Sequence, residues 1–202
     1  MVRDRVHPGN RVPPWAGMTK DQDMKKPEVI WAPWRLDFVQ GTESADPGQA
    51  SEPEYEFYPG ADRDCFLCQA VADRSSGSAR WRHIVANGER TIVVLNKYPY
   101  NNGHLLVAPR RHVGDLTDLT DEERLDLMRE TTRMTEELRR VVRPQGFNVG
   151  INLGSVAGAG LPGHLHIHIV PRWNGDTNFM PAVGGIRVIP QSLDALWSAL
   201  TD

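Results

Sequence analysis

The chain has 202 residues, of which 40% are apolar and 24% are charged, and its formal net charge is −3. This composition is typical of one folded domain with a hydrophobic core, and the slight negative charge gives no electrostatic basis for binding to nucleic acid or to a membrane. No apolar run approaches the roughly 18 residues of a membrane-spanning helix, and no apolar signal-peptide core is present. We therefore expect a cytoplasmic protein.

Three segments are expected to precede the main domain. Residues 1–28 lack any periodicity, which predicts a disordered leader. Residues 29–40 form an N-terminal arm, in which Trp31 and Trp34 either fill the core or attach the arm to the core or to a second subunit. Residues 41–64 are polar and acidic and contain proline and glycine, which is typical of a long loop.

Three strands are predicted between residues 81 and 108. Residues 81–86 and 90–95 have strand composition and flank Asn87-Gly88, a strong hairpin signal. Residues 101–103 predict a second turn that leads into a strand at residues 105–108. We expect a short helix from Cys65 to about Ser75 before these strands.

One long helix is expected to begin after Thr120, because Thr120 and Glu123 form a capping-box pattern, and to end before Pro144. Apolar residues recur at helical spacing and predict a core face. These residues are Leu125, Met128, Met134, Leu138, and Val141 or Val142. Strands at residues 147–153 and 165–170 and a helix from Ser192 to Leu200 complete the prediction. Strands interrupted by one long helix, without βαβ alternation, indicate an α+β fold on a largely antiparallel sheet.

The segment Gly163–Arg172 contains three histidines at alternate positions. An extended strand places alternate side chains on opposite faces. One face would carry His164, His166 and His168, and the other Leu165, Ile167 and Ile169. The apolar face accounts for a strand that packs on a core, whereas the histidine row has no such role. Histidine acts as a nucleophile, acid–base group or metal ligand near neutral pH, so we interpret the row as a functional site rather than as exposed polar residues.

This row resembles the signature of the histidine-triad family of nucleotide hydrolases and transferases, in which histidine and apolar residues alternate as in residues 164–170. Residues 31–35, 96–104, 146–154 and 171–181 also resemble its bacterial diadenosine tetraphosphate hydrolases and phosphorylases. The resemblance covers about residues 29–190. It implies a histidine-triad domain at residues 65–190 and a C-terminal helix at residues 191–202, with a mainly antiparallel five-stranded sheet and a homodimeric assembly.

The resemblance also implies roles for individual residues. His166 would attack the α-phosphate and form a nucleotidyl-histidine, which a hydrolase passes to water and a phosphorylase to inorganic phosphate. His168 and Asn152 would contact the phosphate, Asn96 the ribose hydroxyls, and His104 would support the triad. On residue type alone, Asn96 is equally well explained as a turn residue that ends a strand, and Asn152 is better explained as a strand-end residue that caps a turn.

A glycine-rich loop at residues 154–163 leads into the histidine row. Glycine lets a chain approach an anion closely, so backbone N–H groups of Gly158, Ala159 and Gly160 are candidate phosphate donors. Related proteins often carry Gln or Ser four residues before the first histidine, where this chain has Gly160. Only a backbone donor remains at this position, which leaves the preferred acceptor open.

The Cys65-x-x-Cys68 pair supplies two ligands, whereas a structural zinc site needs four. The resemblance supplies the other two, His112 and His164, and implies a closed Cys₂His₂ zinc site that is structural rather than catalytic. Two buried thiols without a metal, or a redox pair, are the alternatives. No organic cofactor is expected.

The expected function is therefore cleavage of a dinucleoside polyphosphate at its α-phosphate, with a small-molecule nucleotide as the partner. A nucleoside phosphoramidase or another nucleotidyltransferase is the first alternative. A nucleotide-binding module with weak catalysis is the second.

Overall fold

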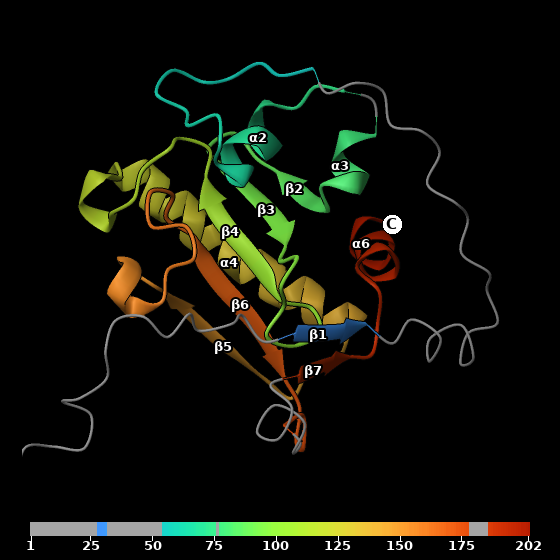
Figure 1. The fold of residues 1–202 in the computed structure, drawn as a ribbon. Coiled ribbons are helices and arrows are strands. Elements are labelled where there is room, and N and C mark those ends of the chain that lie inside the picture. Colours follow the sequence, from blue (N-terminus) through green and yellow to red (C-terminus); the bar gives the residue numbers. More distant parts are fainter. Residues whose placement is uncertain (1–27, 32–53, 76, 178–185) are drawn as a thin grey trace, which may run out of the picture.

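The computed structural model describes residues 28–31, 54–75, 77–177 and 186–202 (Figure 1). Almost all of the predicted leader, most of the N-terminal arm including Trp34, and the first part of the acidic loop lie outside the described residues. The domain boundaries drawn from the sequence therefore stay predictions. No helix of the described part is long and apolar enough to span a membrane.

A five-stranded antiparallel sheet in the order β2-β3-β4-β6-β5 forms the centre of the fold. Its strands are β2 (Ile84–Asn87), β3 (Thr91–Leu95), β4 (Leu105–Pro109), β5 (Gly146–Ile151) and β6 (Ile167–Arg172). The last of these five strands along the chain, β6, lies between β4 and β5 and is therefore an interior strand of the sheet. The predicted α+β fold with five strands is confirmed.

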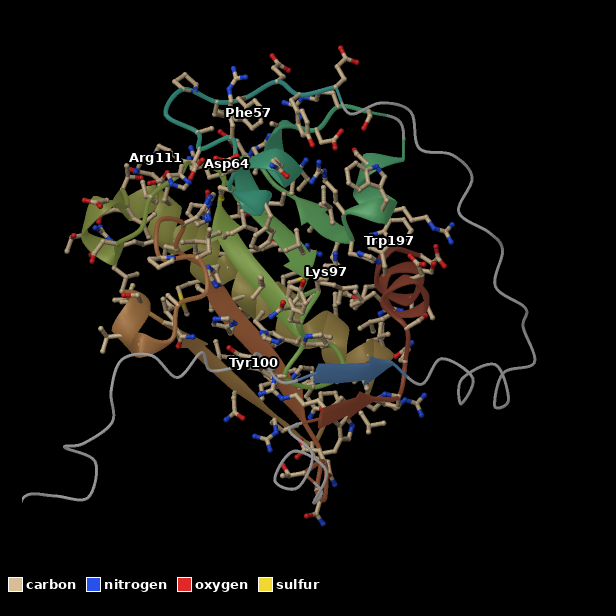
Figure 2. All side chains as sticks on the ribbon, viewed as in Figure 1. Phe57, Asp64, Lys97, Tyr100, Arg111 and Trp197 are labelled. Atoms are coloured by element: carbon tan, nitrogen blue, oxygen red, sulfur yellow. The ribbon has the colours of Figure 1, made fainter. Side chains whose placement is uncertain are left out.

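The two faces of the sheet pack against different helices. One face packs against α4 (Asp121–Val141) and α6 (Leu193–Thr201) through a core that includes Val93, Leu105 and Ile169. The other face packs against α2 (Phe66–Ala72) through residues such as Ile92 and Leu106. In Figure 1, α4 passes behind the strands. The Trp197 indole N–H donates to the Ile84 carbonyl at 2.8 Å and links α6 to β2 (Figure 2).

The long helix α4 begins as predicted. The Thr120 hydroxyl accepts from the Glu123 N–H, and the Glu123 carboxylate accepts from the Thr120 N–H. This reciprocal pair satisfies donors that have no partner within the helix. The C-terminal helix α6 also begins as expected, with the Ser192 hydroxyl as its cap.

The core face of α4 differs from the prediction at two positions. Met134 and Leu138 are buried as expected, and Leu127 is buried with them. Leu125 and Met128 are 49% and 57% exposed, so their assignment to the core was wrong. The stripe that contains Leu127 faces the sheet, and the neighbouring stripe with Leu125 and Met128 turns away from it.

Several smaller elements were not predicted. Trp81, expected to start the first strand, instead ends the short helix α3 (Ser78–Trp81). Two short strands, β1 (Glu28–Trp31) and β7 (Ile186–Ile189), pair in parallel apart from the main sheet. Single 3₁₀ turns occur at η1 (Leu116–Asp118) and η2 (Ser155–Ala157).

Candidate active site and metal centre

Only the last histidine of the row lies in a regular strand, whereas the sequence predicted a strand from residue 165. Strand β6 begins at Ile167, so only His168 lies in the regular strand, while His164 and His166 lie in the segment that leads into it. This segment bonds to the chain that follows β4, where the Leu165 N–H donates to the Val113 carbonyl at 2.7 Å. The alternating apolar residues pack on the α4 side of the sheet as predicted; they are Leu165, Ile167 and Ile169.

A backbone carbonyl orients the ring of His166. Its Nδ1 lies 2.8 Å from the His164 carbonyl oxygen, and His166 is only 7% exposed. A carbonyl can only accept, so Nδ1 carries the proton and Nε2 keeps its lone pair. Burial lowers the pKa of His166 despite the opposing effect of this hydrogen bond, which favours the neutral ring. A neutral imidazole with one held and one free nitrogen is suited to nucleophilic attack.

A chain of hydrogen bonds sets the proton positions on the next two histidines. The backbone N–H of Tyr100 donates to His104 Nδ1 at 3.0 Å, so His104 carries its proton on Nε2. His104 Nε2 lies 3.0 Å from His168 Nδ1 and donates to it. A neutral His168 then carries its proton on Nε2. Asn152 Nδ2 lies 3.4 Å from this nitrogen and is also a donor, so the two groups do not bond to each other and the His168 Nε2–H remains available to a ligand. His168 is therefore a hydrogen-bond donor next to His166, with ring centroids 4.9 Å apart.

Burial keeps these rings uncharged. His104 is 1% exposed, and burial, together with the neighbouring His168, His166 and Arg187, lowers its pKa to about 3. Burial, followed by the charge effect of His166, lowers the pKa of His168 to about 4. At neutral pH the histidine row is therefore neutral, and His168 presents a proton without carrying a positive charge.

Asn96 supports the same chain of bonds. Its Nδ2 donates to His104 Nδ1 at 3.2 Å, and its Oδ1 accepts from the Tyr98 N–H at 2.9 Å. Both ends of the side chain therefore hold the loop before β4. A ribose contact by Asn96 stays a prediction, and the ribose hydroxyls would have to share these groups.

The glycine-rich loop is closed by its own hydrogen bonds. The Gly158 N–H donates to the Ser155 carbonyl at 3.0 Å, and the Ala159 N–H donates to the Gly154 carbonyl at 3.3 Å. At Gly160, a Cβ atom would meet nothing within 4 Å. The same holds at Gly158, so this measure does not distinguish the two glycines, and the phosphate contacts of Gly158, Ala159 and Gly160 stay predictions.

Tyr100 belongs to the site, although the residue pattern did not single it out. Its ring stacks on that of His168 with centroids 5.7 Å apart and an angle of 20° between the planes. Its backbone N–H sets the tautomer of His104. The only sequence signal was its place in the turn before Gly103-His104, and a backbone donor leaves no mark on residue type.

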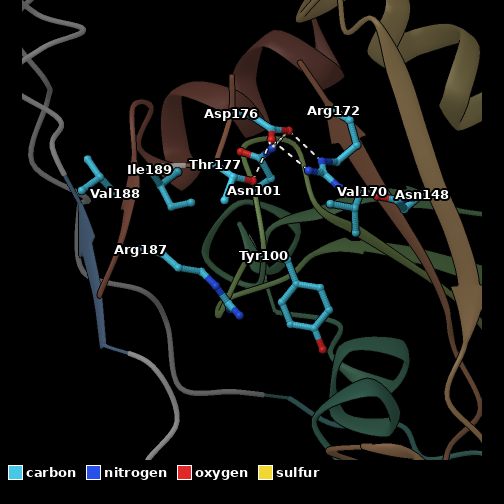
Figure 3. Close-up of a pocket in the computed structure, with 10 residues that line it drawn as sticks. All are labelled: Tyr100, Asn101, Asn148, Val170, Arg172, Asp176, Thr177, Arg187, Val188 and Ile189. Carbon is cyan, nitrogen blue, oxygen red and sulfur yellow. Dashed lines mark hydrogen bonds and ion pairs between the residues drawn. The ribbon is translucent and has the colours of Figure 1, made fainter. Parts of the chain in front are cut away.

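A cleft of about 310 Å³ opens beside Tyr100 (Figure 3). It lies at the C-terminal end of β6 rather than over His166. Val170 and Arg172 from β6, and Arg187 from β7, are among its lining residues. The Arg187 side chain extends toward the Tyr100 ring.

The four residues expected to bind a metal come together. Their ligand atoms all lie within 4.8 Å of one another, and the set comprises Cys65, Cys68, His112 and His164. Cys65 Sγ and Cys68 Sγ lie 3.3 and 3.5 Å from His164 Nδ1, and Cys68 Sγ lies 3.3 Å from His112 Nδ1. A tetrahedral zinc ion with ordinary bond lengths separates its sulfur and nitrogen ligands by about 3.5 Å. The donor set and its spacing therefore fit zinc.

The environment of the cluster prepares His164 as a ligand. Its Nε2 donates to the Pro109 carbonyl at 2.8 Å, which leaves the Nδ1 lone pair facing the thiols. Such outer hydrogen bonds are typical of metal-bound histidines. Burial lowers the pKa of His164 to about 4 and raises that of the Cys68 thiol to about 12. In the absence of a metal the thiol stays protonated, so metal binding would release protons.

The fold and the site define an α+β protein with a row of neutral histidines, of which His164 and His166 are buried, beside a Cys₂His₂ cluster. A family model for the HIT domain matches residues 80–175. A Mycobacterium tuberculosis protein named AP-4-A phosphorylase is 41% identical over 165 residues, which cover 81% of this chain and 77% of that protein. The chain belongs to the histidine-triad (HIT) family.

Two further similarities agree with this assignment. A Schizosaccharomyces pombe protein named bis(5'-nucleosyl)-tetraphosphatase (asymmetrical) is 38% identical over 82 residues, covering 41% of this chain and 44% of that protein. The crystal structure of a Zn-bound histidine triad family protein from Mycobacterium smegmatis aligns with a TM-score of 0.55 and 29% identity. The alignment covers 68% of this chain and 91% of the M. smegmatis chain.

Proposed function

We propose that this protein cleaves a dinucleoside polyphosphate, such as diadenosine tetraphosphate, at its α-phosphate with His166 as the nucleophile. The observation that carries the proposal is the order of protons in the row: His166 Nε2 is a free lone pair, and the adjacent His168 Nε2 is a donor. The names of the two relatives, a phosphorylase and a tetraphosphatase of dinucleoside polyphosphates, support the substrate class.

In the proposed first step, His166 Nε2 forms a bond to the α-phosphorus, and the bond from phosphorus to the bridging oxygen breaks. With diadenosine tetraphosphate, AMP stays on His166 and ATP leaves. The His168 N–H, held by His104, donates to the phosphate or bridging oxygen as negative charge develops there. The amide of Asn152 lies beside His168 and contacts the same phosphate.

In the second step an acceptor attacks the phosphorus, the N–P bond breaks, and His166 recovers its lone pair. Inorganic phosphate as acceptor gives ADP, and water gives AMP. We favour phosphate because the M. tuberculosis relative is named a phosphorylase.

A structural zinc ion at the Cys₂His₂ cluster is part of the proposal. The ion, when bound, would supply a cross-link between α2, the segment after β4 and His164. The carbonyl of His164 orients the His166 ring, so a metal ion that fixes His164 would also fix the position of the nucleophile. A cytoplasmic location, a homodimer and the absence of a nucleic-acid partner stay predictions.

Product analysis tests the function. The purified protein is incubated with diadenosine tetraphosphate, with and without inorganic phosphate, beside His166→Ala. We expect ADP and ATP only when phosphate is present, and no products from His166→Ala. AMP with ATP in the absence of phosphate would instead indicate a hydrolase, whereas two ADP would contradict attack at the α-phosphate.

His83→Asn is a matched control, because His83 lies outside the site and asparagine tolerates its positive φ of 53°. This variant should keep wild-type activity. No turnover by the wild-type protein under either condition would contradict the proposal. It would favour a phosphoramidase, tested with adenosine 5′-phosphoramidate, or a nucleotide-binding module.

A further inference from the structure

The histidine row continues into the cleft beside Tyr100. Alternate residues of β6 share a face, so His168, Val170 and Arg172 follow one another on the same side of the sheet. Val170 and Arg172 line the cleft. Two residues of a strand span about 6–7 Å, so the cleft begins one such step beyond His168. A linear ligand that starts at His166 and passes His168 would enter it.

The two arginines of the cleft differ in their partners. Arg172 donates from Nε and Nη2 to the Asp176 carboxylate at 2.7 and 2.9 Å, and from Nη1 to Asn148 Oδ1 at 2.6 Å. Its charge is therefore balanced by Asp176, and three of its five N–H groups have partners. Among residues 54–75, 77–177 and 187–202, no carboxylate forms an ion pair with Arg187. The cleft thus contains one cation whose charge no described acidic group balances.

The Tyr100 ring holds this cation close to the histidines. The Arg187 guanidinium carbon lies 5.0 Å from the Tyr100 ring centroid, and the same ring stacks on His168. Tyr100 is 47% exposed, so a ligand can reach the stack from solvent. The positive charge of Arg187 also contributes to the low pKa of His104, which agrees with its proximity to the row.

We infer that the cleft is a subsite for phosphate groups beyond the α-phosphate, and that Arg187 is the cation that binds them. This inference rests on the proposed function, which places the α-phosphate at His166. A guanidinium stacked on an aromatic ring keeps its edge N–H groups available, and their geometry matches phosphate oxygens. The phosphates belong either to the leaving nucleotide or to the inorganic phosphate acceptor.

The test uses Arg187→Gln, which removes the charge but keeps a polar side chain. Arg139→Gln is the matched control, because Arg139 also lies over an aromatic ring, that of Phe147, at 5.2 Å on α4. Dissociation constants for AMP and ATP are measured by calorimetry for the wild type and both variants. AMP and ATP share the adenosine and the α-phosphate, and ATP adds two phosphates.

If the cleft holds the leaving phosphates, Arg187→Gln weakens ATP binding about tenfold or more and leaves AMP binding within about twofold, as expected for loss of a charge-assisted hydrogen bond. If it holds the acceptor, both dissociation constants stay unchanged and the KM for inorganic phosphate in phosphorolysis rises about tenfold. Arg139→Gln should match the wild type in every measurement.

Equal losses of AMP and ATP affinity, or values for Arg187→Gln that match those of Arg139→Gln throughout, would overturn the subsite. These outcomes are separate from failure of the proposed function. A wild-type protein that does not cleave diadenosine tetraphosphate contradicts that function, whereas normal turnover with an unaffected Arg187→Gln contradicts only the subsite.

Discussion

Replacement of His104 by Phe should make folding stability less sensitive to acid. His104 is 1% exposed, and burial lowers its pKa from 6.5 to about 3. Such a histidine stays neutral in the folded protein but becomes protonated in the unfolded chain once the pH falls below its ordinary pKa. The unfolded state then binds more protons, so stability is complete above this pH and is lost as the pH falls further.

The magnitude follows from the shift. At pH 5, about 1.5 units below the ordinary pKa, protonation of His104 in the unfolded chain lowers the free energy of unfolding by about 2 kcal/mol relative to pH 8. At pH 8, His104→Phe loses the hydrogen bonds to the Tyr100 N–H and His168, which costs about 1–3 kcal/mol. The difference in free energy of unfolding between the wild type and the variant should therefore become about 2 kcal/mol smaller at pH 5. Only the wild type is destabilised by protonation of His104 in its unfolded state.

Urea unfolding of the wild type and His104→Phe at pH 8 and pH 5, with equal metal content, measures the change. The difference between the two proteins cancels the contributions of the other histidines to a first approximation. A stability deficit that stays constant or widens at pH 5 would refute the reasoning. It would show that His104 is protonated in the folded state, and the proton order assigned to His168 would then be wrong.

His166→Ala should abolish turnover but leave thermal unfolding unchanged; an unfolded variant would contradict the division between a catalytic His166 and a structural His164. Cys68→Ser should lose the bound zinc, measured by elemental analysis, and melt at a lower temperature; retention of zinc would exclude Cys68 as a ligand. Gly103→Ala should lower the free energy of unfolding by about 1–3 kcal/mol in urea titrations. The φ of Gly103 is +78°, and a Cβ would lie 2.9 Å from Pro171 Cγ; unchanged stability would mean that the turn relaxes.

Elements with strong local signals were predicted correctly. The capping box of Thr120 and Glu123 and the turn at Asn87-Gly88 both formed, and the Gly88 N–H closes this turn on the Thr91 carbonyl at 2.9 Å. These features depend on groups a few residues apart. Burial on α4 was less predictable, because Leu125 and Leu127 both fit an apolar stripe and only the position of the sheet distinguishes them.

By itself, the sequence determined the alternation of histidine with apolar residues, the strand into which the histidine row leads, and the types of metal ligand. Only the tertiary structure brought Cys65 to His164 across 99 positions, His104 to His168, and Arg187 to Tyr100. It also decided where the protons lie, because the donor is the backbone N–H of Tyr100 and the acceptor is the carbonyl of His164. Every residue but proline has both groups, so their role depends on position in space and not on residue type.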